Sequence, residues 1–294
     1  MAAPSDVLIG IIGGSGVYKM DFVDAANPTS YKIDTPFGAP SDDILVAEVD
    51  GVKCAFLPRH GRAHTFTPTE VNYRANIFAM KVLGVRYLLS VTAVGSLREH
   101  LQPGDLVVVD QLIDRTSGRK QTFFGNGIVA HVAFSHPMCP NLSKLVVKAV
   151  ATALPNVKVH EGATLVTMEG PAFSTQAESL MNRQLSGDLI GMTTATESKL
   201  CREAEIAHCC VAMVTDMDSW TGDNHVDVAK VMHTLHQNSN NAQIYTKAVI
   251  EAIGRTKPDS EAHDALKVAI MTHKAHIPEA VRLSLQPLIG KYVS

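Results

Sequence analysis

Short segments rich in Val, Ile and Leu alternate along most of the chain with segments whose apolar residues recur at helical spacing, and this alternation strongly restricts the possible folds. Strands are expected at residues 7–12, 44–49, 53–57, 87–92, 106–113, 163–168, 188–192 and 207–215. Helices are expected at residues 69–83, 142–153, 175–183, 196–205 and 226–253. Because several strands are apolar on both faces, helices should cover both sides of the sheet. The pattern predicts an α/β fold with a central mixed, twisted sheet flanked by helices.

The chain is expected to form one domain, because no shift in composition divides its 294 residues. Its 26 basic and 29 acidic residues are spread without long runs, which argues against nucleic acid and anionic membranes as partners. Apolar stretches reach only about ten residues, half of what a membrane-spanning helix needs.

Cysteine usage and the N-terminal composition predict an intracellular location. The five cysteines contain no CxxC pair, which favours free thiols in a reducing compartment. The first residues lack a basic region and place glycines where a signal peptide would have its apolar core. We therefore expect a cytoplasmic protein, with the nucleus as a second compartment.

Small and polar residues follow several of the expected strands, where ligands gather in α/β sheets. The loop from Gly13 to Gly16 lets backbone N–H groups approach an anion, and the Ser15 hydroxyl could donate to a phosphate; a plain tight turn is the alternative. Lys19 occupies the final glycine position of a dinucleotide-binding fingerprint, so that motif does not fit.

The third expected strand is followed by a run of basic side chains. Arg59 presents a planar fork suited to a phosphate, and His60 and His64 add donors; a solvated basic loop is the alternative. Two histidines four apart would suggest zinc on a helix, but Pro58 and Gly61 argue against a helix and no third ligand is near. We therefore expect an anion site and no metal.

Hydroxyl-bearing residues follow two further strands. A small-residue turn is expected at residues 92–96, and Thr193 and Thr194 follow Met192 at another strand end. Such residues are commonly turn formers or helix caps. Their shared position at one edge of the sheet, together with Arg59, instead favours a site for a tetrahedral oxyanion.

The last strand ends in two acids, Asp216 and Asp218. They could bind a divalent ion, form a turn or helix cap, or exchange protons with a heterocycle. The apolar strand before them favours raised pKa values and a proton-donating role. Phe173 follows a Gly-Pro turn and could stack on a base, with a place in the core as the alternative.

Eight segments, taken in order, resemble the trimeric purine nucleoside phosphorylases: GGSG, DTPFGAPS, RHGRAH, NYRANI, GSLREHLQPGDLVVVDQLIDRT, EGPAFST, GMTTATE and TDMDSW. The resemblance covers residues 7–254 and is strongest to the branch that acts on S-methyl-5'-thioadenosine. It implies a homotrimer that cleaves this nucleoside with inorganic phosphate, giving adenine and 5-methylthioribose 1-phosphate, with no cofactor and no metal.

The resemblance also implies a role for each matching residue. Phosphate would be bound by Ser15, Arg59, His60, Thr92, Ala93 and Thr193. The nucleoside would contact His64, Phe173, Ser174, Met192, Thr215, Met217, Val228, Val231 and Met232, with Met192 beneath the sugar and Phe173 facing the base. Asp216 and Asp218 would recognise the base and protonate its N7. His131 would reach into the site of a neighbouring subunit.

Two positions bear on the choice of purine. Phosphorylases of 6-oxopurines carry Glu and Asn where this chain has Ser174 and Asp216, and a carboxylate can accept from a 6-amino group, which favours adenine. The alternatives are a phosphorylase of inosine and guanosine, a nicotinamide-dependent oxidoreductase and a non-catalytic nucleotide-binding module. The missing third glycine argues against the oxidoreductase.

The sequence departs from the family in two places. Thr196 stands where the family has Pro, at the start of a helix. Residues 255–294, a C-terminal helix and tail, are expected to close over the pocket of the 5' group, but the tail carries Gln286, with His276 nearby, in place of an apolar side chain. A polar residue there would weaken the preference for a methylthio group and admit the 5'-hydroxyl of adenosine.

Overall fold

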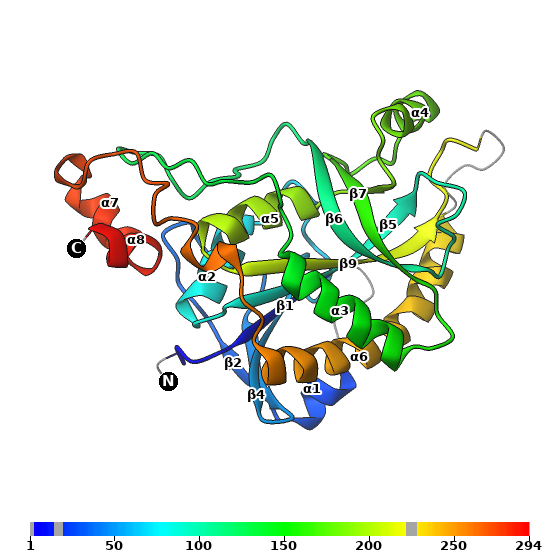
Figure 1. Cartoon of the computed structure of the whole chain (residues 1–294), viewed down its shortest axis with the longest axis horizontal. Helices are drawn as coiled ribbons and strands as arrows, with labels where there is room; N and C mark the ends of the chain where they lie inside the picture. Colours follow the sequence, from blue (N-terminus) through cyan, green and yellow to red (C-terminus); the bar gives the residue numbers. More distant parts are fainter. Residues whose placement is uncertain (1–2, 15–19, 222–227, 294) are drawn as a thin grey trace.

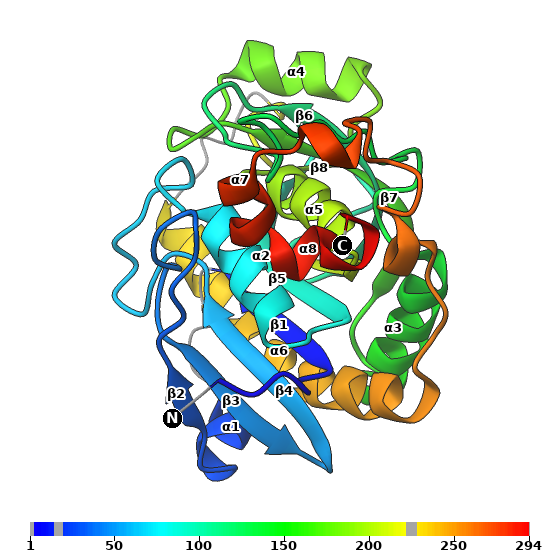
Figure 2. The same cartoon turned by 90° about the vertical axis from the view of Figure 1, so that its left-hand side faces the viewer.

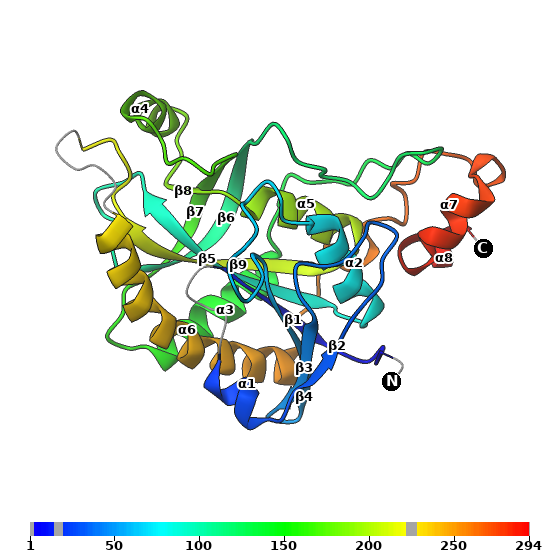
Figure 3. The ribbon, with the colours of Figure 1, turned by 180° about the vertical axis from the view of Figure 1, so that it is seen from behind.

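The computed structural model describes residues 3–14, 20–221 and 228–293. They form three layers, with one sheet between two layers of helices (Figure 1). Helices α1 (Asp21–Ala25), α3 (Pro140–Ala153) and α6 (Val228–Thr256) cover one face. Helices α2 (Tyr73–Val82) and α5 (Thr194–Glu203) cover the other face, and Figure 3 shows the same layers from behind. The predicted α/β class, with a mixed sheet between helices, is confirmed.

Within the described residues the sheet has nine strands in the order β2-β3-β4-β1-β5-β8-β7-β6-β9. They are β1 (Ile9–Gly13), β2 (Thr29–Tyr31), β3 (Ile44–Val49), β4 (Val52–Pro58), β5 (Tyr87–Ser96), β6 (Leu106–Arg115), β7 (Val159–Met168), β8 (Leu189–Gly191) and β9 (Ala207–Asp216). Strand β5 pairs with both β8 and β9, and β9 pairs with β6, so the second half of the sheet closes on itself. Strands β4, β1, β5 and β9 are parallel and bring their carboxyl ends to one edge.

Two apolar layers hold the helices to the sheet. Leu142 of α3 and Tyr245 of α6 belong to the layer on one face, and Ile77 of α2 and Leu200 of α5 to the layer on the other. Both layers draw on the same strands, which is why these strands are apolar on both faces. The five cysteines are free and buried, as predicted. No helix in the described ranges is long and apolar enough to cross a membrane.

Strand β5 is longer than predicted, and the turn predicted at residues 92–96 is wrong. The stretch stays extended because Gly95 pairs with Ile190 of β8 and with Asp216 of β9. A Cβ atom at Gly95 would lie 2.9 Å from the Ile190 side chain. The small residue therefore allows close strand packing rather than a turn.

The other boundaries follow local chemistry. Helix α2 begins at Tyr73, four residues after its predicted start, because the Asn72 side chain caps it by accepting from the N–H of Ala75. Helix α4 (Gln176–Gln184) begins beside its predicted start, after a capping box formed by Thr175 and Glu178. Strand β2 and helix α1 were not predicted, since each is too short to show a period.

The C-terminal segment packs against its own chain. It contains the short 3-10 helices η1 (Glu261–Asp264) and η2 (Lys274–His276), then α7 (Glu279–Ser284) and α8 (Gln286–Val293). Figure 2 shows α8 beside α2 and α5. Leu288 and Ile289 are buried in the apolar layer there. Glu205 accepts from the Tyr292 hydroxyl at 2.5 Å and from Lys291 at 2.8 Å, which fastens α8 to the end of α5.

Candidate active site

A cavity of about 770 Å³ lies at the carboxyl ends of the parallel strands. Gly13 pairs with both Pro58 and Val91, so the residues that follow these three positions meet at one place. A Cβ atom at Gly14 would lie 2.5 Å from Nη1 of Arg59, so only glycine permits this approach. The cavity wall includes these residues expected in the site: Arg59, His60, His64, Thr92, Ala93, Phe173, Met192, Thr193, Thr215, Asp216, Asp218, Val231 and Met232.

Four of them, Arg59, His60, Thr92 and Thr193, make up what we call the anion end of the cavity. The Arg59 side chain is 1% exposed and donates to both carboxylate oxygens of Glu197, from Nε over 2.5 Å and from Nη2 over 3.0 Å. Its Nη1 donates to the carbonyl of Val91 over 3.2 Å. Contacts with described residues therefore use three of the five N–H groups, leaving two for an oxyanion.

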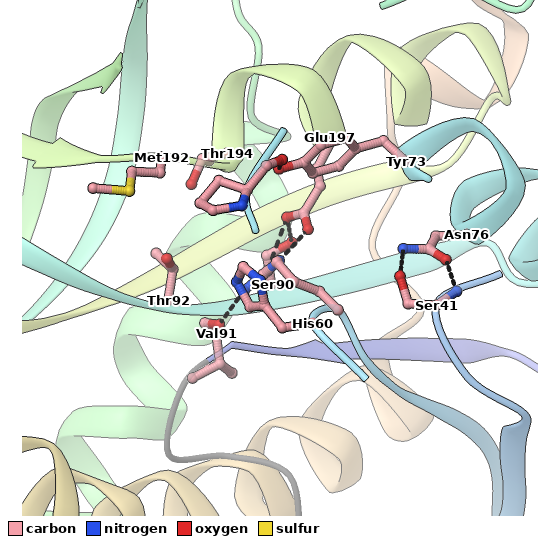
Figure 4. A network of polar contacts seen from close by, with 12 residues as sticks. Ser41, His60, Tyr73, Asn76, Ser90, Val91, Thr92, Met192, Thr194 and Glu197 are labelled. Atoms are coloured by element: carbon pink, nitrogen blue, oxygen red, sulfur yellow. Dashed lines mark hydrogen bonds and ion pairs between the residues drawn. The ribbon is translucent and has the colours of Figure 1, made fainter. Parts of the chain in front are cut away.

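Glu197 was not predicted as part of the site. It is buried in the first turn of α5 and also accepts from the Ser90 hydroxyl at 2.7 Å, as Figure 4 shows. Ser90 in turn contacts Nε2 of His208 at 2.9 Å. Burial lowers the pKa of His208 to about 4, although the Glu197 charge opposes this shift. The imidazole is therefore neutral near pH 7, and Glu197 is left to balance the charge of the buried Arg59.

His60 and Thr193 lie beside Arg59 at the anion end, and of the two only the Thr193 hydroxyl is a free donor. Nδ1 of His60 contacts the carbonyl of Phe66 at 2.8 Å, so in the neutral ring this nitrogen carries the proton. Burial and the Arg59 charge lower the pKa of His60 to about 4. The buried Thr193 hydroxyl has no hydrogen-bond partner in the described part of the chain. It lies at the N-terminus of α5, where backbone N–H groups and the helix dipole favour an anion.

Asp216 and Asp218 form a carboxyl pair in the same cavity. Asp216 accepts from the Thr215 hydroxyl at 2.7 Å and from the backbone N–H of Asp218 at 2.8 Å. Asp218 is buried and adopts a left-handed backbone with φ +46°. Burial raises the pKa of both carboxyl groups above the usual value, against hydrogen bonds that favour the charged form. The predicted raised pKa values are confirmed, and they suit a group that must hold a proton.

The remaining wall is largely apolar. Phe173 is 47% exposed and borders the cavity, so its alternative placement in the core is wrong. Met192 directly follows β8, and Val231 and Met232 extend the wall from the first turns of α6. Among described residues, no group of three or more His, Cys, Asp or Glu side chains could bind a metal. The cavity therefore joins an anion site, an apolar wall and a pair of buried acids.

Comparison with known proteins identifies the family. The model of the phosphorylase superfamily matches residues 8–251. The S-methyl-5'-thioadenosine phosphorylase of Chloroflexus aurantiacus is 51% identical over 288 residues, which cover 97% of this chain and 98% of the relative. The chain belongs to the phosphorylase superfamily, in the family of the S-methyl-5'-thioadenosine phosphorylases.

Solved members of this phosphorylase family share the fold. A methylthioadenosine phosphorylase from an antarctic soil metagenomic library is 46% identical with a TM-score of 0.91, covering 97% of this chain and 99% of that one. A variant of the adenosine/methylthioadenosine phosphorylase of Schistosoma mansoni, solved with methylthioadenosine, is 34% identical with a TM-score of 0.80, covering 89% and 96%. The resemblance expected from the motifs is confirmed.

Some residues expected from the phosphorylase motifs do not line the cavity. Ser174 is buried and its hydroxyl lies 3.7 Å from Sδ of Met168. Met217 is half-buried and absent from the described cavity wall. Ser15 lies outside the described residues, as does the side chain of Val228. Their predicted contacts with phosphate and nucleoside stay predictions.

His131 and the tail also lie away from the cavity of their own chain. His131 belongs to the long segment between β6 and α3, and its N–H donates to the carbonyl of Ala269 at 2.9 Å. Within the described ranges, no residue from 255 onward lines the cavity. Closure of the 5' pocket by the tail therefore remains a prediction, and in this phosphorylase fold it would have to involve a neighbouring subunit.

The cavity also contains residues that the sequence reasoning missed. His236 and Ser239 of α6 line it. His236 follows Met232 by four positions, so helical spacing could have placed it on the same face. Glu197, which pairs with Arg59 but does not itself line the described wall, was also missed. It is separated from Arg59 by 138 positions, so no local pattern could have paired them.

Proposed function

We propose that this protein phosphorolyses S-methyl-5'-thioadenosine. A phosphate oxygen attacks C1' of the sugar, the C1'–N9 bond breaks, and adenine takes the bonding electrons while its N7 accepts a proton. The products are adenine and 5-methylthioribose 1-phosphate, and no cofactor takes part. One observation carries the proposal: the anion end and the buried carboxyl pair belong to the same cavity.

The anion end would bind and orient phosphate. The two remaining N–H groups of Arg59, the Thr193 hydroxyl and the N-terminus of α5 supply donors in a buried setting. Glu197 fixes the guanidinium, so its position is set before phosphate arrives. Holding the nucleophile against the sugar replaces a costly encounter by a pre-oriented one.

The carboxyl pair would act on the base. Burial raises the pKa values of Asp216 and Asp218, which favours a proton on one carboxyl group for transfer to N7. The other, ionised carboxylate can accept from the 6-amino group of adenine. Phe173 and Met192 offer apolar surface to base and sugar.

The 5' end of the substrate would lie against α6. Val231, Met232 and Leu235 give this part of the wall an apolar character that suits a methylthio group. We also propose adenosine as a second substrate, because exposed Gln286 in the tail could hydrogen-bond a 5'-hydroxyl if the tail of one subunit reaches its neighbour.

The proposal includes a homotrimer that acts in the cytoplasm and nucleus, where it returns purine base and methylthio sugar to salvage reactions. Support for self-association comes from exposed apolar residues on the segments that carry His131 and the tail. Val129, Val268 and Met271 are 49%, 88% and 66% exposed. Such side chains gathered on projecting segments are typical of subunit contacts.

The test is a base-release assay. The protein is incubated with methylthioadenosine, adenosine or inosine, each with and without phosphate, and free base and sugar phosphate are measured. We expect phosphate-dependent adenine release, fastest with methylthioadenosine, and little hypoxanthine. Adenine release without phosphate would indicate a hydrolase and contradict the proposal.

A further inference from the structure

Arg119 is a buried cation that the expected site did not include. It follows β6, and its side chain is 1% exposed. Its Nε donates to the Glu169 carboxylate at 2.7 Å and its Nη2 to the Glu169 carbonyl at 2.7 Å. Its Nη1 donates to the carbonyl of Met192 at 3.0 Å and to the hydroxyl of Tyr73 at 2.9 Å. One guanidinium thus contacts three segments that are distant in sequence.

Each of these segments contributes to the cavity wall. Met192 lines the wall itself, and the segment that starts at Glu169 carries Phe173. The Tyr73 hydroxyl donates to the carbonyl of Pro68 at 2.7 Å, and Pro68 also lines the wall. Arg119 therefore sets the spacing between the three without bordering the cavity.

Glu169 is held firmly in this cluster. Its carboxylate accepts from the backbone N–H groups of Ser117 at 2.6 Å and Gly118 at 3.0 Å, and from the Thr69 hydroxyl at 2.5 Å. Partial burial opposes its ionisation, but these hydrogen bonds and Arg119 outweigh burial and lower its pKa to about 2. The carboxylate is therefore charged across the neutral range and keeps Arg119 in place.

Met192 is held on two sides. Arg119 holds its carbonyl, while Gly170 packs so closely on its side chain that a Cβ atom there would lie 2.6 Å from Sδ. Among described residues, the hydrogen bonds of Arg119 reach none of the four residues of the anion end. The cluster therefore acts directly on the nucleoside part of the cavity and is linked to Thr193 of the anion end only through the Met192–Thr193 peptide bond.

We propose that Arg119 is a positioning residue that holds Met192 and the Phe173-bearing segment in the arrangement that binds the nucleoside. The inference rests on the proposed phosphorolysis of methylthioadenosine. Its signature is a split between the two substrates: loss of Arg119 disturbs the nucleoside contacts more than the phosphate contacts, to which Arg119 is linked only through the Met192–Thr193 peptide bond. A residue that only stabilised the fold would affect both alike.

The test compares Arg119→Met with the wild type in steady-state assays that vary each substrate in turn. We expect kcat/KM for methylthioadenosine to fall about 100-fold, the size of effect that a misplacement near 1 Å can have, while KM for phosphate stays within about twofold. Equal loss for both substrates, or an unchanged nucleoside KM, would overturn the inference.

Two further variants keep the result interpretable. Arg98→Met is the matched control, because Arg98 also donates through Nε to a carboxylate, Asp188 at 2.8 Å, but Asp188, unlike Met192, does not line the described cavity wall. The kinetics of this variant should match those of the wild type. Arg119→Lys keeps the charge beside Glu169 but not the fork, so it should fold even if Arg119→Met does not, and show the same split. A Lys variant with wild-type kinetics would contradict the inference.

Adenine affinity, measured by titration calorimetry, separates this inference from the proposed function. Weaker adenine binding by Arg119→Lys than by the wild type supports the positioning role even if the wild type releases no adenine from methylthioadenosine. Equal adenine affinity in the two proteins would count against it.

Discussion

Asp216 shows at the scale of one residue how the fold adapts a common side chain. Burial favours the protonated carboxyl group, while Thr215 and the N–H of Asp218 favour the carboxylate. The balance leaves a pKa above the usual value, as a general acid requires. We expect Asp216→Asn to lower kcat/KM for methylthioadenosine at least ~10²-fold, a typical loss for a general acid, in the same base-release assay.

The control for Asp216→Asn is Asp105→Asn. Asp105 is also buried and accepts from Nε2 of His160 at 2.8 Å, but it does not belong to the described cavity wall. Its loss should leave kcat/KM within about twofold of the wild type. Unchanged adenine release by Asp216→Asn would remove Asp216 from its proposed role.

Helix α5 shows how one element serves several parts of the molecule. Its N-terminus borders the anion end, Glu197 pairs with Arg59, and Glu205, just beyond its C-terminus, fastens the tail. Near the same end Glu203 accepts from the N–H of Phe123 and so holds the segment that leads to His131. Because these contacts are all made by α5 or by the residues directly after it, substitutions there should affect both the stability of the fold and catalysis.

Replacing Glu197 should lower the free energy of unfolding. In Glu197→Gln, Arg59 would remain buried without its balancing charge, and breaking such a pair typically costs about 3–5 kcal/mol. We expect the free energy of unfolding, measured with urea, to fall by roughly this amount. The double variant Arg59→Met/Glu197→Met should recover part of the stability but no activity. A single variant as stable as the wild type would show that the pair is not needed to bury Arg59.

The buried carboxyl group of Glu203, the last residue of α5, should make the free energy of unfolding depend on pH. Burial raises its pKa from 4.5 to about 7, against hydrogen bonds from Phe123 and Thr122. Between these values the folded protein binds more protons than the unfolded chain, so stability from this group falls as pH rises from about 4.5 through 7. Urea unfolding at pH 5 and pH 8 should show this loss in the wild type and a smaller one in Glu203→Gln. Identical pH dependence in both proteins would contradict the assignment.

Elements of this kind also show what could be predicted from the sequence. The period of α3 could be read locally because Leu142, Val146 and Val150 form one regular buried face. The end of β5 could not, because Gly95 owes its extended backbone to partners on β8 and β9. Arg119 was missed for the same reason, since its partners Tyr73, Glu169 and Met192 meet only in the folded chain.

At the scale of the whole molecule, the tail and the segment around His131 lie together, since Ala130 pairs with Ile270. Figures 1 and 2 show α7 and α8 at one end, close to α2, whereas α6 begins at the other end of the molecule. Among the described residues, neither His131 nor any residue of the tail lines the cavity of its own chain. In the proposed homotrimer both would therefore serve the site of a neighbour.

In that arrangement the tail would influence which 5' group the site prefers. We expect Gln286→Leu to raise the ratio of kcat/KM for methylthioadenosine to that for adenosine, because an apolar side chain suits the thioether better than the hydroxyl. Gln184→Leu is the matched control, since Gln184 is also exposed but ends α4. An unaltered ratio in Gln286→Leu would mean that the tail does not line the pocket.

Mixed oligomers test the sharing of sites directly. His131→Ala removes the side chain but keeps the backbone bond to Ala269. Coexpressed with Asp216→Asn, it should form trimers in which about one quarter of the sites combine an intact Asp216 with an intact His131 from the neighbour, as random mixing in a closed ring requires. Each parent alone lacks one of the two groups at every site. We therefore expect the mixture to recover about a quarter of wild-type activity, whereas sites complete within one chain would give only the average of the two parents.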